Sequence, residues 1–164
     1  MKLTKTNLRS TVFGVSDSLV STVGLLSGID ISGMPASSIV LAGVIYAFVE
    51  AFSMAVGSFL SEQSAAEYAA QKEVPIRNAY VAGFIMFISF VLASFIPIAA
   101  YLFMPIAYAI WVSIGLSLAA LFIVGIISAK VSNTDVFRHG LRMAFLGGAA
   151  IVVGAIVGEI TRIH

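Results

Sequence analysis

The sequence predicts an all-α integral membrane protein with five transmembrane helices. Of its 164 residues, 60% are hydrophobic and only 10% are charged, whereas a soluble domain of this size carries about 25% charged residues. The apolar residues form five stretches, and each has the roughly 20 residues that are needed to cross the hydrocarbon core of a bilayer. Because backbone groups in lipid must satisfy their own hydrogen bonds, we expect these stretches to be helical.

The five predicted spans make up a single domain over residues 1–164. Their predicted bounds are 11–30, 38–61, 79–102, 105–129 and 139–161. The first break, "GIDISGMPASS" at 28–38, contains glycine and proline, and Ser37 or Ser38 is expected to cap the next helix.

The later breaks also have local causes. The segment "EVPIRN" at 73–78 precedes the third span, and Pro105 is expected to start the fourth. The segment "KVSNTD" at 130–135 is expected to end the fourth span and to cap the fifth. The only sizeable connection is the short loop 62–78, and its first part favours a continued helix.

Basic residues are distributed unevenly between the two sides of the membrane. One side receives the N-terminus and the 62–78 and 130–142 loops, whereas the other side has only Arg162. The basic residues of the first side are Lys2, Lys5, Arg9, Lys72, Arg77, Lys130, Arg138 and Arg142. Loops rich in Lys and Arg remain on the cytoplasmic side of the membrane. This bias therefore predicts a cytoplasmic N-terminus and a C-terminus that faces outside or into a lumen.

Two acids, Asp17 and Glu50, fall within predicted spans. A carboxylate at the bilayer centre costs about 2.5–3.5 kcal/mol on insertion scales, so it is rarely retained without a function. At about 1.5 Å per residue, Asp17 is expected roughly 9 Å from the cytoplasmic end of its span, and Glu50 deeper, near the midplane. Met54 follows Glu50 by one helical turn. These three residues predict a buried metal-cation site that lines a vestibule open to the cytoplasm.

The types of ligand in this set indicate which cations it would bind. Mg²⁺ and Ca²⁺ prefer oxygen ligands throughout, whereas carboxylates with a thioether suit a first-row transition metal such as Fe²⁺, with Mn²⁺, Co²⁺ or Zn²⁺ as alternatives. Carboxylates in a medium of low dielectric constant also hold protons more readily. Metal and proton would therefore compete for the same groups, which is the basis of exchange.

Simpler interpretations of the same residues remain open at this stage. Asp17 could reach the interface or pair with Arg9, Glu50 could make a purely structural hydrogen bond, and Met54 could be a packing residue. Three acids follow the second span, and they could form a solvated helical face or attract cations toward the vestibule. These acids are Glu62, Glu67 and Glu73.

Small residues recur at helical spacing beside both membrane acids. On the first span they are Gly14, Ser21, Gly24 and Gly28, and on the second they include Gly43 and Gly57. Spacings of three and four residues place each set on one helical face, and small residues let membrane helices approach closely. We expect these faces to pack on each other or on a second copy of the chain.

The two segments that contain the membrane acids and their small residues resemble the vacuolar iron transporter family. They are "VFGVSDSLVSTVGLLSGI" at 12–29 and, most specifically, "EAFSMAVGSFLSEQS" at 50–64. Further resemblance lies at 95–101 and 130–158. It implies a homodimer of five-helix subunits with the metal path at the dimer interface, and Fe²⁺ export from the cytoplasm against inward protons. It also places the family's path residues at Asp17, Glu50 and Met54.

The chain departs from the family pattern in two places. Members often carry Glu where this chain has Ser58, and typical members insert a Glu-rich cytoplasmic metal-binding domain between helices two and three. Only residues 62–78 occupy that place here. Any metal capture or regulation that the domain provides in other members is therefore in question for this chain.

The sequence therefore predicts an Fe²⁺ transporter coupled to protons, with no permanently bound cofactor. The alternatives are an Mn²⁺ or broad divalent-metal exchanger, and a non-transporting membrane scaffold or metal sensor. An enzyme is not expected, because the chain has no Cys and no nucleophile–base pair, and a net charge of +1 gives no indication of nucleic-acid binding. The small size favours a prokaryotic cell membrane over a vacuolar one.

Overall fold

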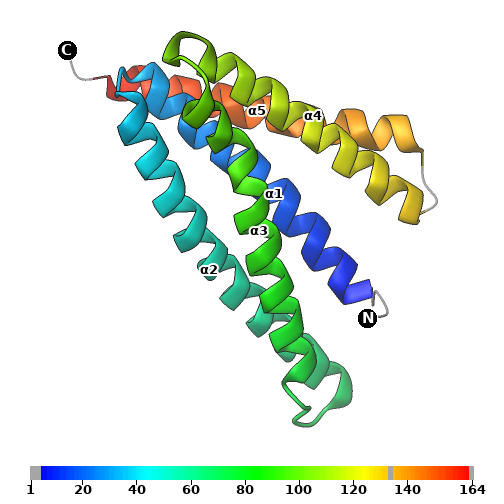
Figure 1. Ribbon diagram of the computed structural model, residues 1–164. Helices are drawn as coiled ribbons and strands as arrows, with labels where there is room; N and C mark the ends of the chain where they lie inside the picture. The colour runs from blue at the N-terminus through cyan, green and yellow to red at the C-terminus, as the bar shows by residue number, and fades with distance from the viewer. Residues whose placement is uncertain (1–4, 133–134, 163–164) are drawn as a thin grey trace.

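The computed structural model describes residues 5–132 and 135–162, which form five long helices (Figure 1). The helices are α1 Lys5–Ile31, α2 Ala36–Ala70, α3 Arg77–Phe103, α4 Ile106–Ser132 and α5 Val136–Thr161. Each is long and apolar enough to cross a membrane. The predicted all-helical membrane fold is therefore confirmed. Lys2, which entered the orientation argument, and residues 133–134 of the 130–135 segment lie outside the described residues.

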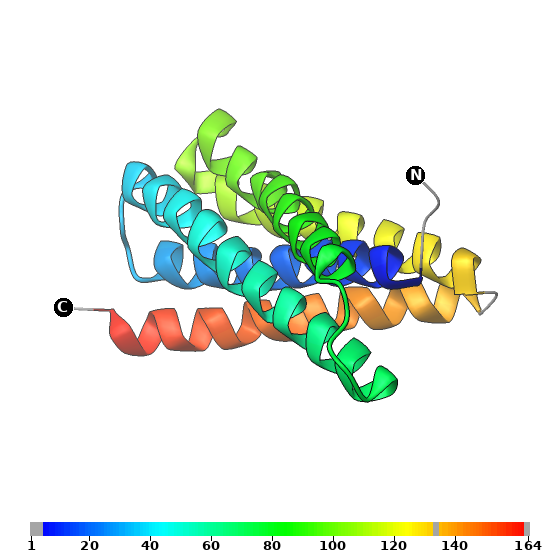
Figure 2. The same ribbon diagram turned by 90° about the horizontal axis from the view of Figure 1, so that it is seen from below.

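The first helix, α1, is the centre of the bundle, because it packs against each of the other four helices. Its side chains Leu19, Val23 and Leu26 are fully buried. The α2–α3 pair forms an antiparallel hairpin that runs obliquely past α1, while α4 and α5 lie along α1 on another side (Figures 1 and 2). Since α2 packs mainly on α3 and much less on α1, space remains between α1 and α2.

The outer faces of the helices carry many large apolar side chains. Phe84, Trp111 and Phe145 are 67%, 71% and 75% exposed, respectively. Soluble proteins rarely expose contiguous apolar patches of this kind. This surface suits contact with lipid.

The second and fourth helices both begin directly after a proline. The carbonyl oxygen of Pro35 accepts hydrogen bonds from the backbone N–H groups of Ser38 and Ile39, at 2.9 and 3.1 Å. At the start of α4, the Pro105 carbonyl oxygen accepts from the backbone N–H groups of Tyr108 and Ala109. The fixed φ angle of proline suits the start of a helix. Pro35 therefore occupies the cap position of α2, where no side-chain cap forms. The prediction that Ser37 or Ser38 caps this helix is wrong.

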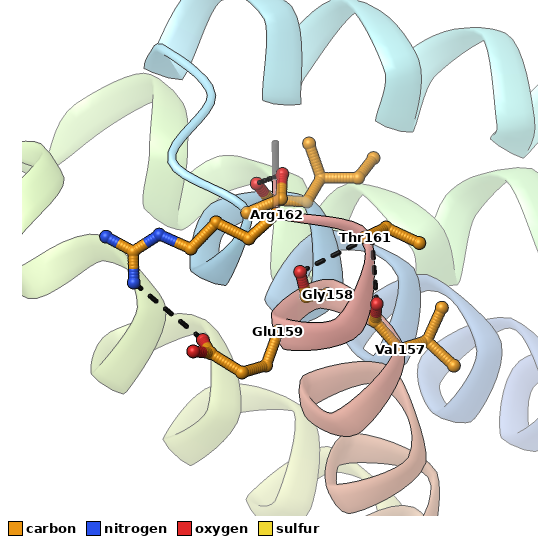
Figure 3. Close-up of polar contacts among 7 residues, drawn as sticks. Val157, Gly158, Glu159, Thr161 and Arg162 are labelled. Atoms are coloured by element: carbon orange, nitrogen blue, oxygen red, sulfur yellow. Dashed lines mark hydrogen bonds and ion pairs between the residues drawn. The ribbon is translucent and has the colours of Figure 1, made fainter. Parts of the chain in front are cut away.

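The fifth helix does have a side-chain cap. The Asp135 carboxylate accepts a hydrogen bond from the backbone N–H of Arg138 at 2.9 Å, as the 130–135 segment predicts. At the other end of α5, the Thr161 hydroxyl donates to the Val157 carbonyl at 2.8 Å, and Glu159 lies 3.8 Å from Arg162 (Figure 3). This ion pair is exposed and therefore contributes little to stability.

The contact between α1 and α5 depends on glycine on both helices. A side-chain carbon at Gly154 would overlap the carbonyl oxygen of Gly24, and one at Gly158 would overlap that of Gly28. Gly24 and Gly28 of the small face of α1 thus pack on α5, whereas the sequence suggested packing on α2 or a second copy. Periodicity identifies a small face but not the helix that will pack on it.

The other small residues beside the acids also find partners within the chain, with one exception. A side-chain carbon at Gly14 would lie 3.1 Å from Met86 and Ser89 of α3, and one at Gly43 would meet Leu26 at 2.9 Å. Gly57 faces open space. Gly14 and Gly43 therefore bring α1 close to α3 and to α2, respectively.

Replacing Gly154 with alanine should destabilise the protein. The added methyl group would have to separate α1 from α5, and overpacking of this kind costs about 1–3 kcal/mol. Gly148→Ala is the matched control on the same helix, because a carbon added there meets nothing within 4 Å. Alanine should leave that variant as stable as the parent or stabilise it by up to about 1 kcal/mol. Thermal unfolding in detergent measures both, and equal effects would contradict the assigned α1–α5 contact.

Candidate functional site

Asp17 and Glu50 lie at the same level of the bundle on facing helices. Asp17 is fourteen residues before α1 ends at Ile31, and Glu50 is fourteen residues after α2 begins at Ala36. Both side chains are partly buried, and they are close enough for their charges to repel each other. The structure thus brings together the two acids that sequence analysis singled out.

Their relative depth differs from the sequence-based expectation, which placed Glu50 one turn deeper than Asp17. That expectation was counted from the cytoplasmic ends of the predicted spans, and both helices extend beyond those ends, α1 to Lys5 and α2 to Ala70. Counted from the connection between α1 and α2, each acid is about 21 Å along its helix.

A polar layer surrounds the two acids. The Ser21 hydroxyl donates to the Asp17 backbone carbonyl oxygen at 2.6 Å, and the Tyr46 side chain lies near Ser21 and both acids. Sequence analysis missed Tyr46, although it precedes Glu50 by four residues and so occupies the same helical face. On the adjoining side of α1, the buried Ser18 hydroxyl donates to the Phe90 carbonyl oxygen at 2.7 Å. This last bond fixes α1 to α3 next to Asp17.

A cavity of about 330 Å³ opens between α1, α2 and α3, and we refer to it as the vestibule. Its lining includes Arg9, Met54, Gly57, Ser58, Glu62 and Met86. Met54 thus lies where the sequence predicts a vestibule, whereas Asp17 and Glu50 lie about one turn deeper and are not part of its lining. A larger groove of about 500 Å³ between α1 and α5 is lined mainly by glycine and apolar residues, and so offers few ligands.

Of the three acids that follow the second span, only Glu62 belongs to the vestibule. Its carboxylate accepts a hydrogen bond from the Thr6 hydroxyl at 3.1 Å, which joins α2 to α1. Glu67 instead accepts from Gln63, which also donates to the Val74 carbonyl oxygen. Glu73 is exposed in the turn before α3.

The set of possible metal ligands is small. Among the side chains that the structure describes, which do not include that of His139, no three His, Asp or Glu lie close enough together to hold a metal ion. Within the same part of the chain, Asp17 forms no ion pair with Arg9, so pairing with Arg9 does not explain this acid. The chain offers two carboxylates with a thioether about one turn away.

The sequence matches the VIT family over residues 8–76 and 69–159, which is nearly the whole chain. The chain belongs to the VIT family. Members of this family are membrane transporters of metal ions. The two matched segments meet at residues 69–76, at the turn where typical members of the family are expected to carry an additional domain.

A relative of this VIT protein occurs in the archaeon Methanocaldococcus jannaschii. The sequence is 28% identical to the uncharacterized protein MJ0645 over 163 residues, which covers 88% of this chain and 84% of the relative. The similarity therefore extends across most of the helical domain.

A hydrogen bond joins α1 to α3 at the end of the bundle opposite the vestibule. There, the Tyr101 hydroxyl of α3 donates to the Asp30 carboxylate of α1 at 2.9 Å. Tyr101 is only 5% exposed and packs with Leu26, Ile39 and Ile98 in the core. Sequence analysis assigned no role to this pair, because the two residues are 71 positions apart and no local pattern connects them.

Tyr101→Phe should destabilise the protein by about 1–3 kcal/mol, because it removes the donor to a partly buried carboxylate. Tyr108→Phe is the matched control, since Tyr108 is 65% exposed, and it should change stability by less than about 0.5 kcal/mol. Thermal unfolding of both variants in detergent provides the comparison. A Tyr101→Phe protein as stable as its parent would show that the hydrogen bond contributes nothing.

Proposed function

We propose that this VIT protein carries a divalent transition metal, Fe²⁺ foremost, out of the cytoplasm in exchange for protons. The observation that supports this most strongly is the pair of acids at one level of the bundle, Asp17 on α1 and Glu50 on α2. Two carboxylates in an apolar environment repel each other unless a cation or a proton lies between them. A site that is stable with either a metal or protons can exchange one for the other.

The proposed direction of transport follows from the side on which the vestibule opens. The vestibule lies at the end of the bundle where α1 begins and α2 ends, and the distribution of basic residues predicts that this end is cytoplasmic. Metal would enter past Glu62 and Met54 and then bind between Asp17 and Glu50. The Asp30–Tyr101 pair marks the opposite side, toward which the metal would leave.

Protons are the proposed coupling ion for an energetic reason. Moving a divalent cation out of an inside-negative cell costs about 4.6 kcal/mol at 100 mV, at about 2.3 kcal/mol per charge. Exchange for two protons cancels this electrical cost and leaves the pH gradient to drive transport. The acids that bind the metal would also carry the protons, and no permanently bound cofactor is required.

A homodimer is the proposed assembly, with the metal path between two subunits. One subunit provides too few ligands for a complete metal site, and α2 packs only lightly on α1 beside the acids. A second copy would supply another Asp17, Glu50 and Met54. The archaeal relative favours a prokaryotic cell membrane as the location.

Glu50→Gln and Asp17→Asn should each lower Fe²⁺ flux into proteoliposomes by about 10- to 100-fold, the loss that is common when groups at a metal site are altered. Flux is measured with and without a pH gradient, and with Mn²⁺, Zn²⁺ and Mg²⁺ as competitors to identify the preferred metal. Glu159→Gln is the matched control, because this acid lies at the exposed end of α5 in a pair with Arg162. Full flux in both path variants would refute the proposal.

The same variants distinguish a transporter from a scaffold. If the acids exist to bind cations, removing one charge relieves repulsion, and the metal-free amide variants should be as stable as the parent or more stable, by about 1 kcal/mol. Saturating metal should stabilise the parent, by about 2.7 kcal/mol at 100 times Kd, but not the variants. A structural scaffold predicts the reverse, namely a lower melting temperature for both variants and no response to metal.

A further inference from the structure

The vestibule is lined by two thioethers from different helices. Met54 comes from α2 and Met86 from α3. The packing between these helices fixes their relative height, because Gly83 of α3 lies against Ala55, and the rings of Phe59 and Tyr80 are 4.9 Å apart. Met54 adjoins Ala55 in sequence, and Met86 is about one turn beyond Gly83. The two methionines therefore lie within about one helical turn of each other.

The first helix holds Met86 in this position. A side-chain carbon at Gly14 would lie 3.1 Å from the Met86 sulfur, so the thioether passes directly over the α1 backbone at a site where only glycine leaves it room. Met86 is 4% exposed, and the vestibule is the cavity that it lines. The sulfur is thus placed one turn from Asp17, since Gly14 precedes Asp17 by three residues.

We propose that Met86 is a second thioether ligand for the transported metal and selects soft or borderline cations at the entrance to the acid pair. This inference builds on the proposed transport function. Thioethers bind soft and borderline metal ions and discriminate against Mg²⁺, Ca²⁺ and Mn²⁺, which prefer oxygen. Met54 and Met86 would form a thioether site that a metal passes, after the Glu62 carboxylate about two turns nearer the cytoplasm, before it reaches Asp17 and Glu50.

Metal binding to the purified full-length protein tests this site, with Cd²⁺ as the soft probe and Mn²⁺ as the hard one. Met86→Leu should weaken Cd²⁺ binding about 10-fold, as changes at metal sites commonly do, and leave Mn²⁺ binding unchanged. Met86→Gln, which offers an amide oxygen, should also weaken Cd²⁺ binding but strengthen Mn²⁺ binding. Met143→Leu is the matched control, because Met143 packs beside Leu19, Ala93 and Leu121 and is not part of the vestibule lining.

Unchanged Cd²⁺ binding in Met86→Leu, or an equal loss of both metals, would overturn the inference in favour of a packing role. If Met86→Leu does not fold, the Met54→Leu protein labelled with selenomethionine provides a second measurement. With Cd²⁺ bound, X-ray absorption should still detect selenium bonded to cadmium, and its absence would overturn the inference. The proposed transport function could fail while this inference holds. In that case the protein without substitutions, labelled with selenomethionine, would bind Cd²⁺ through selenium but would show no metal flux in proteoliposomes.

Discussion

Repulsion between two carboxylates in an apolar bundle is the constraint on which the site depends. Asp17 and Glu50 face each other at one level, and neither can be charged at low cost without a cation or proton nearby. The polar layer formed by Ser21 and Tyr46 supplies hydroxyl groups but no positive charge. Groups of this kind can bind either a cation or a proton, which is the property that the proposed exchange requires.

The packing around α1 explains how such a pair can be held in place. Glycines let α1 approach α5 and α3 closely, and the Ser18 and Tyr101 hydrogen bonds join it to α3. Asp17 is thus carried on the most constrained helix. Glu50 is on α2, which leans on α3 and leaves the vestibule open on the side of α1. The two acids are therefore carried on helices that pack only lightly on each other.

The short turn between α2 and α3 makes the groups inside the bundle more important. Residues 71–76 leave no room for a further folded domain between these helices, so in the proposed function metal selection relies on the groups described above. In the proposed path, a metal meets a carboxylate and two thioethers in the vestibule and then two carboxylates deeper in the bundle. Soft and hard cations would then be distinguished at the thioethers, before the metal reaches the acids.

The five membrane helices and the residues most costly to bury could be predicted from the sequence. Both follow from transfer energies, which depend on composition along the chain and not on which helices pack together. Three features became visible only in the folded chain: Gly24 and Gly28 pack on α5, Pro35 takes the cap position expected of a serine, and Met86 lines the vestibule with Met54. Those outcomes depend on which helices meet and at what height, and hydrophobic periodicity contains no information on either.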